Sequence, residues 1–236
     1  MPTLEKMILA IDSSIGSGVA IVDAESDEVR GQASSEAPRG HAEVIGTLIE
    51  QALAEANVTP ADITHVAAGM GPGPFTGLRI GIAAARAFAI GRGIPVVPVA
   101  SHDAAALAVL DEDPSALFVI VTDARRRENA VSAYAGLVGD LPNRTAGPEL
   151  LPHTEDPFAW LAVHSPSTPG SSVPQSLRDR VQNDEAGAVP TTRIPAANIA
   201  RIAARMIRQN AIVEIEPLYL RAPDARPPGV VKRVST

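Results

Sequence analysis

The feature that most constrains the fold of this chain is the order of the apolar segments in its N-terminal half. Short apolar runs bounded by turn residues predict strands, and longer stretches with helical periodicity predict helices. The resulting order is three strands, a helix, a strand, a helix and a strand, which predicts an α/β domain with helices packed on a sheet. The predicted strands are 7–12, 18–22, 28–34, 65–71 and 95–100, and the helices are 41–57 and 76–92, with a short helix near 101–110.

The composition narrows the class of protein further. Apolar residues make up 45% of the 236 residues but aromatic residues only 3%, so the core must be built from Ala, Val, Ile and Leu. Cysteine is absent, which excludes disulfides, thiolate zinc sites and a cysteine nucleophile and fits a cytoplasmic protein. No apolar run reaches about 18 residues, so neither a membrane span nor a signal peptide is expected.

The charge pattern argues against a chain that binds nucleic acid by itself. The net charge is −7, and the one basic tract is Arg125–Arg127. A protein that holds nucleic acid alone normally carries a clustered basic face. If RNA is involved, another molecule is expected to supply most of the binding.

The chain is predicted to divide into two lobes at the acidic, proline-ended segment Asp111–Pro114. The strand expected at Leu117–Asp123 ends in Asp and is followed by a turn and a second strand, as at the start of the chain, which hints at a duplication. Composition predicts loops with one or two weak helices between Pro152 and Pro195, a region rich in Pro, Ser, Thr and Gly. The predicted parts are a first lobe at 1–110, a second lobe at 111–220 with weak helices at 156–164 and 174–183 and a final helix at 196–210, and a flexible tail at 221–236.

The stretch GMGPGPFTGLRIGIAAARAFAIG, residues 69–91, is a glycine-rich turn that opens a helix, as in many phosphate-binding loops. It lacks the lysine of a Walker loop, and Thr76 stands where a dinucleotide fingerprint has its third glycine. Pro72 and Pro74 also lack the backbone N–H groups that would hold phosphate oxygens. The stretch suits the start of a helix better, with Thr76 as the predicted N-cap.

Small residues recur every fourth position in the helix that follows: Gly77, Gly81, Ala85 and Ala89. Glycine in a helix costs roughly 1 kcal/mol relative to alanine, so a close approach of another backbone is expected to offset it. Two interpretations remain open. Either this small-residue ridge packs on the protein's own sheet, or the helix of a partner docks on it.

Five strings in order along the chain resemble the TsaB (YeaZ) family. They are ILAIDSS, GHAEVI, GPGPFTGLRIG, DARRRE and EPLYLRAPDA, and they span most of the sequence. The family has serine where Pro74 stands, which is a modest departure. The resemblance implies an actin/Hsp70-like fold of two ribonuclease-H-like lobes, with the second lobe reduced.

The resemblance also implies a non-catalytic role in making threonylcarbamoyladenosine at position 37 of tRNA. It implies docking on the catalytic relative TsaD through the first lobe's two helices, with a TsaE-type ATPase joining and tRNA bound by the whole complex. A homodimer is expected when the partner is absent, and ATP or ADP is expected near the interface rather than as a cofactor of this chain. The residues predicted to contact the partner are Val44, Ile45, Leu48, Ile49, Gly77, Gly81 and Ala85.

The residues available for nucleotide chemistry are few. Asp12, Ser14 and Thr76 are the candidate nucleotide contacts, but Ser13 replaces the glycine that lets actin-like ATPases close on phosphate. Asp123 is the second-lobe counterpart of Asp12, and both carboxylates could instead terminate strands and accept turn hydrogen bonds. We therefore expect weak or no nucleotide binding by the chain alone, and no catalytic residue is assigned.

A metal site and a protease site also lack their usual patterns. No two of the five histidines lie within ten residues, His41 opens the first helix, and neither HExxH nor GxSxG occurs, so no metal ligand is assigned. The alternative to a scaffold is a free-standing actin-like ATPase or peptidase. The alternatives differ in whether the purified chain turns over substrate alone.

Overall fold

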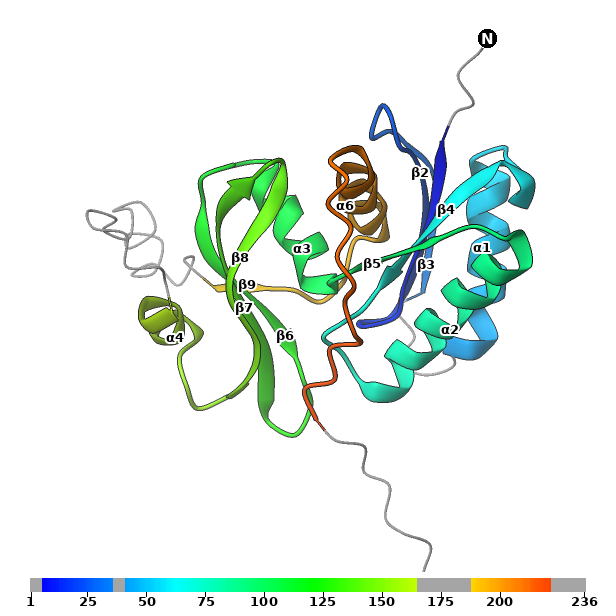
Figure 1. Cartoon of the computed structure of the whole chain (residues 1–236). Helices are drawn as coiled ribbons and strands as arrows, with labels where there is room; N and C mark the ends of the chain where they lie inside the picture. Colours follow the sequence, from blue (N-terminus) through cyan, green and yellow to red (C-terminus); the bar gives the residue numbers. More distant parts are fainter. Residues whose placement is uncertain (1–5, 36–40, 165–187, 222–236) are drawn as a thin grey trace, which may run out of the picture.

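The structure is a computed structural model and describes residues 6–35, 41–164 and 188–221. Two sheets stand apart with helices between them and on their outer faces (Figure 1). The first sheet has the strand order β3-β2-β1-β4-β5. Strands β1 to β3 form an antiparallel meander, while β4 and β5 extend the sheet in parallel from β1. The strands are β1 (Met7–Asp12), β2 (Ser17–Asp23), β3 (Val29–Ser35), β4 (Ile63–Gly69) and β5 (Val96–Val99).

The first sheet is buried on both faces because helices cover each of them. Helices α1 (His41–Glu55) and α2 (Phe75–Arg92) cover its outer face, and every residue of β1 and β2 is buried. Continuously apolar strands such as MILAID are typical of this arrangement. The short 3₁₀ helix η1 (Pro60–Asp62) leads into β4.

Helices α3 (Ser101–Leu110) and α6 (Ala196–Arg208) lie between the two sheets (Figure 1). One apolar cluster joins residues of β1, both helices and the second sheet, among them Ile8, Leu107, Ile120 and Ile199. The core therefore continues from one lobe into the other. The final helix was predicted as part of the second lobe, but α6 packs mainly against β1 and β2 of the first sheet.

The second sheet has the order β8-β7-β6-β9, with an antiparallel meander and one parallel edge strand. Its elements are β6 (Leu117–Asp123), β7 (Glu128–Val138), β8 (Leu141–Pro152) and β9 (Ala188–Pro190), with α4 (Pro157–His164) on its outer face. The fold is thus α/β with two ribonuclease-H-like lobes of the actin/Hsp70 type, and the second lobe is the smaller one.

The predicted strands and helices of the first lobe are confirmed to within about two residues, as are α4 and α6. Strands β8 and β9 were not predicted. β8 contains three prolines and a glycine (LPNRTAGPELLP), and β9 is only three residues long, so neither shows strand periodicity. The helix expected at 174–183 lies outside the described residues. The division at residue 110 stays a prediction.

Within the ranges that the structure describes, no helix is both long and apolar enough to cross a membrane.

Candidate functional site: the cleft between the lobes

The lobes face each other across a cleft of about 830 Å³. Its first-lobe wall is the turn after β1 and the start of α2, which contribute Ser13, Ser14 and Thr76. Its second-lobe wall includes Asp123 and Arg125 from the turn after β6. Both walls therefore combine a turn with the end of a rigid element, where binding groups commonly lie.

Asp12 lies beneath the cleft rather than on its surface, since it is only 2% exposed. One carboxylate oxygen accepts hydrogen bonds from the Ser14 amide (3.0 Å) and hydroxyl (2.7 Å). The other accepts from the Ser101 hydroxyl at 2.5 Å. Burial raises the pKa of Asp12, and these hydrogen bonds oppose that shift. The carboxylate therefore fixes the turn and joins β1 to α3.

Ser13 occupies the space that a glycine would leave open. Its hydroxyl donates to the Gly77 carbonyl oxygen (2.6 Å) and accepts from the Gly81 amide (3.0 Å). It thus bridges two groups one helical turn apart on α2. Adding a Cβ to Gly81 would place that atom 2.2 Å from the Ser13 oxygen, so the helix can lie this close only with glycine at position 81.

The small-residue ridge faces the protein's own interior, which corrects part of the predicted partner interface. Gly77, Gly81, Ala85 and Ala89 are all buried within the chain. The physical reason is the close approach of α2 to the turn after β1. Of the two interpretations left open by the sequence, packing on the protein's own sheet is the one observed.

The α1 residues predicted to contact a partner divide into two groups. Ile45 and Leu48 belong to the core under the first sheet, with exposures of 8% and 5%. Val44 and Ile49 are half-buried at the edge of that core. Only the second pair has side-chain surface to offer.

The outward side of α2 carries an apolar stripe that sequence analysis did not single out. Ala83, Ala87 and Ile90 are exposed, and Ile80 is half-buried. Ile90 is 80% exposed, the highest value among the exposed large apolar side chains in the described part of the chain. We call these four residues the α2 stripe. The spacing was readable, but the sequence could not show which side of the helix faces outward.

Thr76 was predicted as the N-cap of α2, and this is wrong. The helix begins at Phe75, and Pro74 occupies the N-cap position. The Leu78 amide donates to the Pro74 carbonyl oxygen at 3.0 Å. Proline has no side-chain acceptor, so no side-chain cap is formed, and its φ angle of −58° suits a helix start. Thr76 is instead exposed and lines the cleft beside Ser14.

Asp123 terminates β6 and accepts a turn hydrogen bond, as one sequence alternative proposed. Its carboxylate accepts from the Arg125 amide at 2.8 Å and forms an ion pair with the Arg125 guanidinium at 3.7 Å. Arg125, Arg126 and Arg127 all have positive φ, at 64°, 56° and 62°. We call Arg125–Arg127 the arginine turn.

The segment after α6 crosses from the first lobe to the arginine turn (Figure 1). No role in the cleft was predicted for it from the sequence. The Leu218 amide donates to the Met70 carbonyl oxygen at 2.8 Å, and the Tyr219 ring lies 4.7 Å from the Phe75 ring. Arg221 begins the predicted tail, yet it forms an ion pair with Glu128. Residues 222–236 lie outside the described residues.

A buried polar group at the start of α3 connects that helix to the second sheet. The two ring nitrogens of His102 lie 2.8 Å from the Ser132 hydroxyl and 3.0 Å from the Thr122 hydroxyl. Burial lowers the pKa of His102 to about 3, so the ring is neutral at pH 7. One nitrogen then donates and the other accepts.

Asp103 makes a second connection of the same kind. Its carboxylate accepts from the Tyr134 hydroxyl at 2.7 Å and lies 3.6 Å from the Arg144 guanidinium. Burial raises the pKa of Asp103, while Arg144 and Tyr134 oppose the shift. These contacts, like the bond from Ser101 to Asp12, come from consecutive α3 residues and attach both lobes to one helix end.

The structure thus brings Ser14 and Thr76 together on one cleft wall and places Asp12 behind them. The signal that could have indicated the α3 connections is the polar run Ser-His-Asp directly after an apolar strand. Among the residues that the structure describes, no three His, Asp or Glu side chains are grouped so that they could hold a metal ion.

Residues 20–146 of the chain match the family model described as TsaD, tRNA N6-adenosine threonylcarbamoyltransferase. An uncharacterized protein of Mycobacterium tuberculosis is 35% identical over 225 residues, covering 94% of this chain and 95% of that protein. A tRNA N6-adenosine threonylcarbamoyltransferase of Streptococcus suis is 40% identical over 136 residues. That match covers 50% of this chain and 40% of the transferase.

Two solved structures share the fold over nearly the whole chain. YeaZ from Pseudomonas aeruginosa has a TM-score of 0.67 at 20% identity, covering 91% of this chain and all of YeaZ. A protein from the same organism, described as similar to peptidase YeaZ, has a TM-score of 0.69 at 22% identity, covering 92% of this chain and all of that protein.

Proposed function

Because this chain belongs to the TsaD family, we propose that it is a non-catalytic subunit that docks on a TsaD-type transferase and supports threonylcarbamoyl transfer to tRNA. The proposal extends to a TsaE-type ATPase and tRNA as further members of the complex, and to a cytoplasmic complex. The fold shared with YeaZ supports a TsaB-type role within the family.

The observation that carries docking is the α2 stripe. Ile90 is 80% exposed, and Ala83 and Ala87 lie beside it on the same side of the helix. Small side chains around one large apolar residue allow a partner helix to approach closely while Ile90 is buried. A TsaD-type protein is the occupant that fits, because a family member offers helices of the same kind as α1 and α2 for a quasi-symmetric pairing. The same surface would pair with a second copy of this chain when the partner is absent.

A non-catalytic role is supported by how the cleft uses its polar groups. The Asp12 carboxylate is fully engaged by Ser14 and Ser101, and the Ser13 hydroxyl is engaged by α2. These groups hold the fold together and are not presented to a ligand. Any ATP or ADP in the cleft would meet the exposed Thr76 side chain first, because Asp12 and Ser14 are both only 2% exposed and bonded to each other. The free-standing ATPase or peptidase is therefore not favoured.

The test is calorimetric titration of the chain with the TsaD-type subunit of the same cell, using wild type and Ile90→Glu. A charge in the α2 stripe is expected to weaken docking at least tenfold, because a buried unpaired carboxylate is strongly unfavourable in an interface. Val163→Glu is the matched control, since Val163 is 79% exposed on α4 of the other lobe.

Equal weakening by both variants, or none by Ile90→Glu, would remove the α2 stripe from the interface. Absence of wild-type binding would overturn the scaffold role itself. In that case ATP or peptide turnover by the purified chain alone would identify the free-standing enzyme.

A further inference from the structure

The arginine turn has a backbone conformation that its residue types do not explain. Three consecutive residues have positive φ, which costs a non-glycine residue roughly 1–2 kcal/mol each. Glycine and asparagine adopt this conformation with less strain and are the usual residues in such turns. Three arginines here are therefore unfavourable for the turn itself, and strain of this kind is commonly retained for function.

The turn is held in place on several sides. Its Arg125 amide donates to Asp123, and the Arg127 carbonyl oxygen accepts from the His153 amide at 2.9 Å. The Arg221 guanidinium donates to the carbonyl oxygens of Ala124 (2.8 Å) and Arg125 (3.2 Å). These hydrogen bonds therefore hold the strained backbone of the arginine turn in place.

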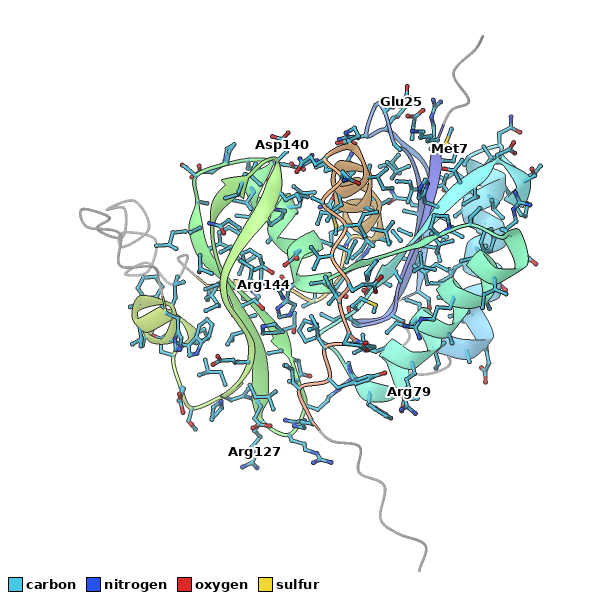
Figure 2. All side chains as sticks on the ribbon, in the orientation of Figure 1. Met7, Glu25, Arg79, Arg127, Asp140 and Arg144 are labelled. Carbon is cyan, nitrogen blue, oxygen red and sulfur yellow. The ribbon has the colours of Figure 1, made fainter. Side chains whose placement is uncertain are left out.

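The turn is also cationic in a protein of net charge −7. All three arginines are exposed, and Arg127 projects from the end of the second lobe into solvent (Figure 2). The neighbouring carboxylates of Asp123 and Glu128 pair with Arg125 and Arg221. Arg79 adds a further cation across the cleft on α2 (Figure 2).

An aromatic pocket of about 360 Å³ opens beside the turn. Phe75 and Tyr219 line it from the first lobe and the C-terminal segment, and Arg125 and Arg126 line it from the turn. The guanidinium of Arg79 lies 3.9 Å from the centre of the Phe75 ring, and Phe75 is the residue of this pair that lines the pocket. Aromatic rings beside guanidinium groups are the combination that proteins use to hold an unpaired base next to its phosphates.

We propose that the arginine turn and the aromatic pocket form an RNA contact, in which Arg126 and Arg127 bind phosphodiester oxygens and the pocket takes up one unpaired base. This inference rests on the proposed function, which supplies tRNA as the RNA. The contact is small, so most of the affinity of a complex for tRNA comes from its other subunits. The proposed RNA contact gives the second lobe a function, whereas docking involves only the first lobe.

The test measures fluorescence anisotropy of a labelled, unmodified tRNA anticodon stem-loop with the chain alone and with the assembled complex. Arg126→Glu/Arg127→Glu is expected to weaken binding by the chain about tenfold or more at low salt, and to reduce the slope of log affinity against log salt by about 1 to 2. Arg86→Glu/Arg92→Glu, which makes the same charge change toward the far end of α2, is the matched control for binding by the chain alone.

Tyr219→Leu tests the pocket separately. It is expected to weaken stem-loop binding roughly fivefold or more, because stacking on an aromatic ring contributes about 1–3 kcal/mol per base. The salt slope should stay unchanged, and a blunt RNA duplex, which has no unpaired base, should bind wild type and Tyr219→Leu equally. Circular dichroism confirms that each variant is folded.

Unchanged binding by the arginine variant, equal weakening by the control variant, or no binding of the stem-loop by wild type in either form would overturn the proposal. Calorimetric docking of the arginine variant on the TsaD-type subunit separates the two proposals. Normal docking with unchanged RNA affinity overturns only the RNA contact, whereas loss of wild-type docking overturns the proposed function.

Discussion

At the scale of single residues, His102 links the pH of the solution to the stability of the fold. Its pKa falls from 6.5 to about 3 because the ring is buried. Below pH 6.5 the unfolded chain takes up a proton that the folded chain does not, so the free energy of unfolding is greatest above that pH and declines as the pH falls toward about 3. Between pH 7 and about 5.5, this one group is expected to lower the free energy of unfolding by about 1 kcal/mol.

Urea unfolding at several pH values checks this expectation with His102→Gln, whose amide can still bond to Ser132 and Thr122. The variant should lose that part of the decline, while His153→Gln, at an exposed histidine, should behave as wild type. Asp12 and Asp103 act with the opposite sign, because their raised pKa values favour protonation in the folded state. The effect of these two carboxylates is common to the wild type, His102→Gln and His153→Gln. An identical pH profile for His102→Gln would show that the buried ring is not the sensor.

At the scale of elements, two of the three glycines of α2, Gly81 and Gly91, lie in different environments. A Cβ at position 81 would lie 2.2 Å from the Ser13 oxygen, whereas a Cβ at position 91 would meet nothing within 4 Å. Gly81→Ala is therefore expected to destabilise the protein by about 1–3 kcal/mol through overpacking and the loss of the Ser13 bonds. Gly91→Ala should instead stabilise it, by up to about 1 kcal/mol, through helix propensity alone.

Urea midpoints followed by circular dichroism measure both glycine changes. Adding Ser13→Gly to Gly81→Ala should recover part of the loss, since it removes the atoms that clash. If Gly81→Ala were as stable as wild type, α2 would not lie on the turn after β1 as described.

At the scale of the whole molecule, the two lobes share one core and are joined by α3. Ser101 bonds to Asp12 of the first lobe, while His102 and Asp103 bond to the second. We therefore expect one cooperative unfolding transition. Fluorescence of the single tryptophan, Trp160 on α4, reports the second lobe, and far-UV circular dichroism reports all helices. The two urea curves should coincide, and separate midpoints would show that the lobes unfold independently.

Much of the architecture was predictable because local patterns carry it. Strands such as Met7–Asp12 are uniformly apolar, and α1 shows helical spacing, so both could be placed without tertiary information. Strand β8 could not, because its prolines and glycine hide the pattern and only pairing with β7 makes it a strand.

The candidate site was also predictable only in part, because it too depends on contacts between residues far apart in the sequence. Ser14 and Thr76 were identified and do share the cleft wall, but the sequence left open whether the small-residue ridge of α2 faces a partner or the protein's own sheet. Helical spacing shows which residues share a side, not whether that side meets a partner or the protein's own turn. That decision depended on Ser13, whose contact with Gly81 spans 68 residues of sequence.

By itself, then, the amino-acid sequence determined the order of elements in the first lobe, the composition of the core, the family and the candidates near Asp12, because local propensity and motif identity need no long-range contacts. Only the tertiary structure decided that Asp12 is enclosed, that α6 packs on the first sheet, and that Tyr219 and Arg221 reach the arginine turn. Each of these depends on residues far apart in the chain, and their meeting is set by how the two sheets pack around α3 and α6.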